Sequence, residues 1–226
     1  MTEENEYTLA RERMVRDQIV PRRISDERVL SAMRTVPRHR FVPPDLRHLA
    51  YTDAPLPIGH RQTISQPYIV ALMTSLLELK EDDKVFEVGT GSGYQAAILA
   101  HIANQVFTIE RIGEIADKTR ELFQELGLKN IHVVEGDGSL GLEEEAPFDA
   151  IIVTAAAPKV PEPLKEQLAD GGRMVLPVGG RNGQILELWK RKGRKLEKDR
   201  LAPVAFVPLV GDQGWESEEG PHSWWR

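Results

Sequence analysis

The stretch KVFEVGTGSGYQAAILA at residues 84–100 constrains the fold of this chain more than any other part of it. An apolar run with the composition of a β-strand leads directly into GTGSG at residues 89–93, and a helix-forming run follows. A glycine-rich turn between a strand and a helix brings backbone N–H groups and a helix N-terminus to the carboxyl end of a sheet, where ligands bind in open α/β folds. We therefore expect a ligand site at this turn; a tight turn without a ligand is the alternative interpretation.

The segments after this turn alternate between strand-like and helix-like patterns. Strands are predicted at residues 84–88, 105–110, 130–136, 148–156 and 173–178, and helices at residues 92–103, 112–126 and 161–169. This βαβα alternation predicts an α/β fold with a doubly wound, mostly parallel sheet. Two further apolar runs, at residues 184–191 and 201–210, flank a turn and predict an antiparallel pair at one edge of that sheet.

The chain before the turn has a different character. Residues 5–36 have the pattern of two helices, with Ser25 as the candidate N-cap of the second and Pro37 after its end. Residues 37–66 are proline-rich and irregular, and a loop of that length inside a compact domain is usually functional or disordered. Its aromatic and apolar residues favour an ordered, functional loop. A helix is predicted from Pro67 onward.

We expect one domain over residues 1–226, because a chain of this length can bury a substantial core. Within it, residues 1–80 are expected to form N-terminal helices and a substrate loop, and residues 81–180 the ligand-binding core. Residues 181–226 are expected to form edge strands and a tail.

Charge and composition exclude several classes of protein. The formal net charge is −6, so the chain lacks the basic character that duplex DNA or RNA binding requires. The absence of cysteine excludes disulfides, thiolate metal sites and cysteine nucleophiles. No apolar signal region opens the chain, and the apolar patch at residues 68–79 is too short to span a bilayer. We therefore expect a cytoplasmic protein that binds no metal, no nucleic acid and no membrane.

The spacing of the glycines separates two classes of ligand. Dinucleotide-binding turns have the pattern G-x-G-x-x-G, whereas Gly89, Gly91 and Gly93 form G-x-G-x-G. Glu87 stands two positions before the first glycine. This variant resembles motif I of S-adenosylmethionine-dependent methyltransferases, and the resemblance implies a sheet of the Rossmann-like methyltransferase type.

Polar residues at the next two strand ends extend the predicted site. Glu110 ends the second predicted strand, at the place where a carboxylate accepts hydrogen bonds from ribose hydroxyls. Asp137 and Gly138 follow the third strand, where the carboxylate would take an adenine amino group and the glycine would let the backbone approach the ring. Each has a plainer interpretation alone, a surface glutamate and an ordinary Asp-Gly turn. Together the three strand ends predict one extended nucleoside ligand.

Six segments, spread over nearly the whole chain, carry a more specific resemblance. They are RERMV at residues 11–15, TISQP at 63–67, EVGTGSGYQAA at 87–97, FDAIIVTAA at 148–156, LPVG at 176–179 and FVPLVG at 206–211. In these segments the chain resembles the protein-L-isoaspartate O-methyltransferase family. The glycine motif is shared with many methyltransferases, whereas TISQP and its placement are specific to this family. The chain departs from the family pattern at Arg61, where glycine is frequent.

The resemblance implies a protein-repair reaction. The methyl group of S-adenosylmethionine passes to the free α-carboxylate of an L-isoaspartyl residue, which leaves S-adenosylhomocysteine; the ester then closes to a succinimide without the enzyme. The implied partners are isoaspartyl-containing proteins and peptides, and we expect the enzyme to act as a monomer. Cofactor binding is predicted for Glu87, Gly89, Thr90, Gly91, Ser92, Gly93, Glu110, Asp137 and Gly138, and substrate binding for Thr63, Ile64, Ser65 and Val207.

This acceptor requires no general base. An α-carboxylate, with a pKa of about 3.5, is already ionised at pH 7, so catalysis rests on the alignment of oxygen, methyl carbon and sulfur. Ser65 is the candidate catalytic residue, through a hydrogen bond that places the carboxylate. An alternative role for Ser65 is to cap the helix that begins near Pro67, and the two roles are compatible. His60 is expected to be a surface residue of the loop.

Two other functions stay open at this stage. A methyltransferase of a small-molecule carboxyl or hydroxyl group fits the glycine motif, as does a non-catalytic nucleotide-binding module. Nucleic-acid enzymes that methylate amino groups resemble one another in an N/D-P-P-Y/F motif after the fourth strand, where this chain has TAAAPKVP at residues 154–161. At the end of the chain, the adjacent residues Trp224 and Trp225 predict a tail that packs on the protein.

Overall fold

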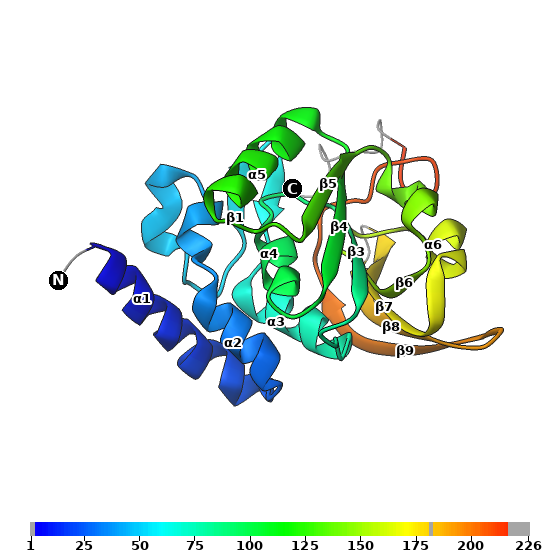
Figure 1. Cartoon of the computed structure of the whole chain (residues 1–226), viewed down its shortest axis with the longest axis horizontal. Coiled ribbons are helices and arrows are strands. Elements are labelled where there is room, and N and C mark those ends of the chain that lie inside the picture. Colours follow the sequence, from blue (N-terminus) through cyan, green and yellow to red (C-terminus); the bar gives the residue numbers. More distant parts are fainter. Residues whose placement is uncertain (1–2, 181–182, 217–226) are drawn as a thin grey trace.

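A seven-stranded sheet forms the centre of the computed structural model, which describes residues 3–180 and 183–216 (Figure 1). Its strands lie in the order β5-β4-β3-β6-β7-β8-β9. They are β3 (Lys84–Val88), β4 (Gln105–Glu110), β5 (Ile131–Glu135), β6 (Phe148–Val153), β7 (Leu168–Gly180), β8 (Gly183–Lys192) and β9 (Lys195–Val204). The strands from β5 to β7 in that order are parallel, and β8 and β9 continue the sheet in antiparallel fashion. This sheet confirms the predicted fold class. The predicted packing of the tail concerns Trp224 and Trp225, which lie outside the described residues.

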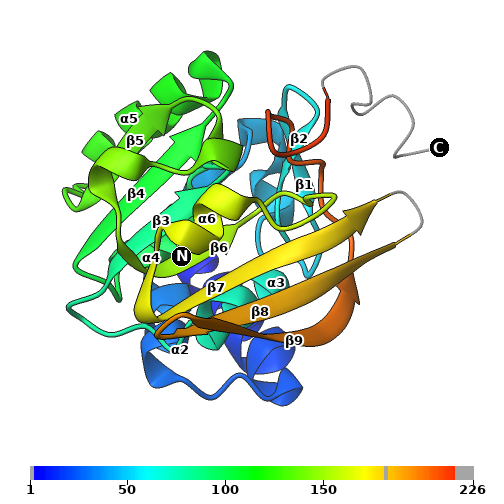
Figure 2. The same ribbon diagram turned by 90° about the vertical axis from the view of Figure 1, so that its right-hand side faces the viewer.

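Helices cover both faces of this sheet. They are α1 (Glu3–Arg13), α2 (Glu27–Thr35), α3 (Pro67–Leu76), α4 (Tyr94–Ala100), α5 (Gly113–Glu125) and α6 (Glu162–Glu166). Successive side chains of a strand point to opposite faces, so Val85 packs in the core with α2, α3 and α4, while Phe86 packs in the core with Leu164 of α6. Figure 1 shows α1 and α2 beside α3, away from the projecting end of the hairpin β8–β9, and Figure 2 shows β7, β8 and β9 side by side at one edge of the sheet. Among the described residues, no helix is long and apolar enough to cross a membrane.

The proline-rich segment at residues 37–66 is ordered, and it contains a hairpin that the sequence does not reveal. The hairpin consists of β1 (Leu56–Gly59) and β2 (Gln62–Ile64), which pair in antiparallel fashion. Its turn holds His60 and Arg61 in the left-handed region, with φ of 47° and 58°. That conformation costs a residue with a side chain about 1–2 kcal/mol. A glycine at position 61 would avoid this cost at that residue.

Several predicted boundaries are wrong for identifiable reasons. The N-cap of α2 is Asp26 rather than Ser25, since the Asp26 side chain accepts a hydrogen bond from the N–H of Arg28 at 3.0 Å. Strand β9 spans Lys195–Val204 instead of residues 201–210. The charged residues at its start have the composition of a solvated turn, but an edge strand tolerates and often carries such charges.

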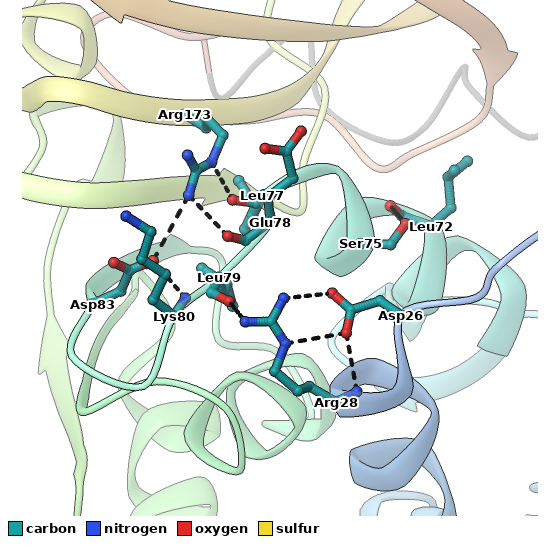
Figure 3. A network of polar contacts seen from close by, with 10 residues as sticks. All are labelled: Asp26, Arg28, Leu72, Ser75, Leu77, Glu78, Leu79, Lys80, Asp83 and Arg173. Atoms are coloured by element: carbon teal, nitrogen blue, oxygen red, sulfur yellow. Dashed lines mark hydrogen bonds and ion pairs between the residues drawn. The ribbon is translucent and has the colours of Figure 1, made fainter.

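Two arginines hold the connection between α3 and β3 (Figure 3). Arg173 of β7 donates hydrogen bonds to the carbonyl oxygens of Leu77 and Glu78, the second at 2.9 Å. Arg28 of α2 donates to the carbonyl oxygen of Leu79. These carbonyls follow the last turn of α3 and have no partner within the helix. The arginines therefore tie the end of α3 to the sheet and to the N-terminal helices.

Candidate active site

A cavity opens at the carboxyl ends of β3, β4 and β6 and encloses about 860 Å³, counting its open mouth. Of the predicted site residues, the structure brings these together in the wall of the cavity: Thr63, Ile64, Ser65, Gly89, Thr90, Gly91, Ser92, Glu110, Gly138 and Val207. The other three, Glu87, Gly93 and Asp137, lie behind the wall.

The glycine turn has a backbone that only glycine adopts without strain. Gly89 and Gly91 have φ of 96° and 50°. A Cβ atom on Gly89 would lie 2.5 Å from the hydroxyl oxygen of Thr154, so the position excludes any side chain. Thr154 follows β6, and its hydroxyl donates to the carbonyl oxygen of Gly89 at 2.7 Å. The end of β6 therefore holds the turn in place.

Most N–H groups of the turn bond within the protein. Those of Gly89 and Thr90 donate to the carbonyl oxygen of Ile109 at 2.9 and 3.2 Å, and that of Gly91 donates to Glu110 at 3.0 Å. A phosphate-binding turn keeps such donors for the anion. This turn instead lets a ligand approach the backbone closely without offering a phosphate site, which fits a nucleoside cofactor that carries no phosphate.

Glu110, at the end of β4, shapes the turn and faces the cavity. One carboxylate oxygen accepts the N–H of Gly91 and the other accepts the N–H of Ile112, both at 3.0 Å. Each carboxylate oxygen can accept more than one hydrogen bond. Glu110 thus keeps the capacity to accept ribose hydroxyls, and that role stays a prediction.

Glu87 lies beneath the turn, fully buried. One carboxylate oxygen accepts the hydroxyl of Thr108 at 2.5 Å, and Thr108 is in turn 2.7 Å from the hydroxyl oxygen of Thr90. The other oxygen of Glu87 has no hydrogen-bond partner within the described residues. Burial raises the pKa of Glu87 to about 8. The side chain is therefore mostly protonated at pH 7 and supports Thr90 from below instead of facing the ligand.

Gly93 and Asp137 also act from behind the wall. A Cβ atom on Gly93 would lie 2.6 Å from the side chain of Thr119, so this glycine lets α4 pack closely against α5. The two carboxylate oxygens of Asp137 accept the N–H groups of Ser139 and Asp212 at 2.9 and 2.7 Å. Asp137 thereby anchors the C-terminal segment over the strand ends, and its pairing with adenine stays a prediction.

The wall opposite the glycine turn consists of Thr63 and Ile64 of β2 and of Ser65, which follows it. The carbonyl oxygen of Ser65 accepts a hydrogen bond from Arg38 at 2.7 Å. The N-cap residue of α3 is Gln66, and no side chain caps that helix. The capping interpretation of Ser65 is therefore wrong, and the helix makes no use of its hydroxyl.

The segment at residues 206–210 closes the cavity above the end of β6. The N–H of Ala156 donates to the carbonyl of Val207 at 2.7 Å, and the N–H of Leu209 donates to the carbonyl of Ala156 at 2.8 Å. The indole N–H of Trp215 donates to the same carbonyl at 3.1 Å. Val207 is thus held in the wall by backbone pairing.

His60 is exposed at the hairpin turn, outside the wall of the cavity, and its Nε2 atom lies 3.2 Å from Glu114. The prediction of a loop residue away from the chemistry agrees with this position. The carboxylate of Glu114 also pairs with Lys118, which together with His60 lowers the pKa of Glu114.

Among the polar residues of the wall that sequence analysis missed are Thr154 and Gln95. Thr154 could have been predicted from the sequence, because it follows a parallel strand next to β3 and the ends of such strands carry ligand sites. Gln95 gives no such signal in a helix. Its amide nitrogen donates to the hydroxyl of Thr74 at 2.9 Å, which links α4 to α3 under the cavity. Within residues 3–180 and 183–216, no three His, Asp or Glu side chains are grouped to hold a metal ion.

Comparison with known proteins agrees with this geometry. Residues 9–214 match the family described as protein-L-isoaspartate(D-aspartate) O-methyltransferase. A protein-L-isoaspartate O-methyltransferase of Methanoculleus marisnigri is 56% identical over 93% of this chain and 96% of its own length. One of Geobacter metallireducens is 54% identical over 94% and 99%. Among solved structures, a putative protein-L-isoaspartate O-methyltransferase of Plasmodium falciparum, in complex with S-adenosyl-L-homocysteine, superposes with a TM-score of 0.77 at 28% identity, over 88% of this chain and 98% of that one.

Replacing Glu110 with alanine should weaken binding of S-adenosylhomocysteine about tenfold to a hundredfold, since a charge-assisted hydrogen bond contributes roughly 1.5–3 kcal/mol. Isothermal titration calorimetry on the folded variant measures the effect. Glu135→Ala is the matched control, because Glu135 pairs with Glu110 in the sheet but lies outside the cavity. Equal affinity in the wild type and Glu110→Ala would remove Glu110 from the cofactor site.

Replacing Glu87 with glutamine should reduce the pH dependence of stability. The folded state keeps a proton on Glu87 up to about pH 8, whereas the unfolded chain releases it near its ordinary pKa of about 4.3. The free energy of unfolding therefore falls as pH rises through this window, by about 1.4 kcal/mol for each unit of pKa difference. Urea unfolding at pH 5 and pH 8 should show a smaller fall for Glu87→Gln than for the wild type. The same fall in both proteins would contradict the assignment.

Proposed function

This chain belongs to the protein-L-isoaspartate(D-aspartate) O-methyltransferase family, and from that membership we propose how its cavity carries out the family's reaction. The enzyme uses S-adenosylmethionine to methylate the free α-carboxylate of L-isoaspartyl residues in damaged proteins and peptides. Membership in this family sets aside both a small-molecule acceptor and a non-catalytic nucleotide-binding module.

The cofactor supplies an electrophilic methyl group on a sulfonium. A carboxylate oxygen of the isoaspartyl residue forms a bond to the methyl carbon as the bond from carbon to sulfur breaks, and the products are a methyl ester and a thioether. The neighbouring backbone nitrogen of the substrate then displaces methanol, which forms the succinimide without the enzyme. No proton leaves the acceptor before transfer, because the α-carboxylate is already ionised at pH 7.

The cavity has the groups that this chemistry needs. The described residues of its wall include no histidine. The carboxylate in the wall, that of Glu110, already accepts two backbone N–H groups. Neither feature hinders a reaction that uses no base. The chain contributes alignment: the strand ends would hold the nucleoside, and the wall of residues 63–65 would hold the acceptor.

Ser65 is the residue that we assign to the acceptor carboxylate. It lies in the wall opposite the glycine turn, its backbone carbonyl is fixed by a buried arginine, and its side chain does not cap the following helix. A hydroxyl on a fixed backbone can donate a hydrogen bond to one carboxylate oxygen and leave the other to attack. This placement carries the proposal, with Thr63 and Ile64 shaping the floor beside it.

The peptide substrate would bind as an added strand. Strand β2 pairs with β1 along one edge, and no other described strand pairs with its second edge. Capture along such an edge reads the main chain and tolerates varied side chains. Val207 lies across the cavity in an extended segment, where it would contact the peptide from the other side.

We also propose that the enzyme acts as a monomer in the cytoplasm, where its cofactor and its aged protein substrates are both present. Its net charge of −6 argues against nucleic acid as a partner.

Replacing Ser65 with alanine should lower kcat/KM for an isoaspartyl peptide about tenfold to several hundredfold, at ~1.4 kcal/mol per decade, with little change in affinity for S-adenosylhomocysteine. Steady-state kinetics with radiolabelled cofactor measure the first and calorimetry the second. Ser75→Ala is the matched control, since the Ser75 hydroxyl bonds only to the carbonyl of Leu72 within α3. Wild-type kinetics in Ser65→Ala would exclude the hydroxyl from the reaction.

A further inference from the structure

A single buried arginine touches both walls of the cavity. Arg38 begins the short helix Arg38–Phe41 and has no exposed surface. Its Nε atom donates to the carbonyl oxygen of Ala50 and its Nη2 atom to that of Ser65, both at 2.7 Å. Its guanidinium carbon lies 4.7 Å from the ring centroid of Tyr94.

These three contacts join parts of the site that are distant in the sequence. Ala50 precedes the hairpin β1–β2 and Ser65 follows it, so one side chain ties both ends of the hairpin segment. Tyr94 is the first residue of α4, directly after the glycine turn, and is 1% exposed. Phe41 packs edge-on against the same ring at 5.5 Å. The guanidinium thus spans from the acceptor wall to the helix that carries the cofactor turn.

Stability alone does not explain a charge at this place. Burial lowers the pKa of Arg38 to about 10, which leaves it charged at pH 7. Within the described residues it forms no hydrogen bond to a carboxylate, and its Nη1 atom has no hydrogen-bond partner. A buried charge without a hydrogen-bonded carboxylate is costly, even with the favourable charge of Asp53 acting on it, and an apolar side chain of similar volume avoids that cost.

The arginine supplies a geometry that no other side chain can reproduce. Its planar guanidinium donates in two fixed directions while its face lies on an aromatic ring. A lysine ammonium is a compact point charge and cannot hold two carbonyls apart at a set distance. Arg38 therefore acts by fixing the backbone positions of Ala50 and Ser65 relative to Tyr94.

We propose that Arg38 is a positioning residue for methyl transfer, which holds the backbone of Ser65 at a fixed distance from the glycine turn. The inference rests on the proposed function of the wall at residues 63–65 and deepens it. A displacement of about 1 Å between reacting groups can slow a reaction on the order of a hundredfold. Arg38 meets the cofactor side only through the ring of Tyr94, and its hydrogen bonds go to Ala50 and Ser65, so cofactor affinity should persist when Arg38 is replaced.

Two variants separate geometry from charge. Arg38→Lys keeps the charge and loses the planar fork, whereas Arg38→Gln loses both the charge and the reach to two carbonyls. Arg173→Lys is the matched control: Arg173 also donates to two successive carbonyl oxygens, those of Leu77 and Glu78, beyond the opposite end of α3. All three variants lose comparable hydrogen bonds, and only those at Arg38 act on the acceptor wall.

The readouts are kcat and KM with an isoaspartyl peptide, the Kd of S-adenosylhomocysteine, and the melting temperature. Both Arg38 variants should lower kcat about tenfold to a hundredfold with Kd within about threefold of wild type. Arg173→Lys should lower the melting temperature and keep kcat. Wild-type kcat in either Arg38 variant would overturn the proposal. A rise in Kd that accompanies the fall in kcat would also overturn it. Loss of cooperative unfolding in both Arg38 variants would also overturn it, because Arg38 would then be a folding determinant.

Ser65→Ala, measured in the same series, separates this proposal from the one on which it rests. If the Arg38 variants are slow and Ser65→Ala is not, Arg38 positions the wall and the hydroxyl is not used. If Ser65→Ala is slow and the Arg38 variants are not, the hydroxyl acts and the positioning role of Arg38 is wrong.

Discussion

The left-handed backbone of the glycine turn is the constraint on which the site depends. Gly89 can hold its conformation because Thr154 bonds its carbonyl, and the hydroxyl of Thr154 occupies the space where a Cβ would be. Glu110 holds the next part of the turn through the N–H of Gly91. Three strand ends thus meet at one short loop, and most of its N–H donors bond inside the protein. What remains is a surface that a nucleoside can approach closely, which suits a cofactor whose charge lies on sulfur instead of phosphate.

The sheet and the cofactor side of the site could be predicted because they follow from local patterns. Parallel strands buried on both faces are apolar runs, and their ends gather ligand-binding residues at one edge. Gly89, Gly91 and Glu110 lie in the wall of the cavity because each is at or just after the end of a parallel strand. The wall at residues 63–65 was predicted only through resemblance, since nothing in the local pattern places TISQP opposite the turn.

The rest depends on tertiary contacts that a sequence pattern does not record. Glu87 and Gly93 belong to the glycine motif by position, yet one lies under the turn and the other serves the packing of α4 on α5. Spacing alone does not tell a residue that faces the ligand from one that supports it, because this depends on which other elements pack against the motif. Arg38 is one arginine in an irregular segment, and only its burial between two backbone carbonyls distinguishes it. The hairpin β1–β2 escapes notice because its turn contains no glycine at position 61.

The central claim is that the enzyme recognises its substrate by the position of a carboxylate relative to the main chain. An isoaspartyl residue presents its free α-carboxylate where a strand-like peptide would place it against residues 63–65, and a normal aspartyl residue presents its side-chain carboxylate from a different backbone register. Two synthetic peptides of one sequence, one with L-isoaspartyl and one with L-aspartyl, test this when base-labile methyl ester is counted with radiolabelled cofactor. The account predicts that kcat/KM for the isoaspartyl peptide is greater by on the order of a hundredfold or more. Comparable values for the two peptides would contradict it.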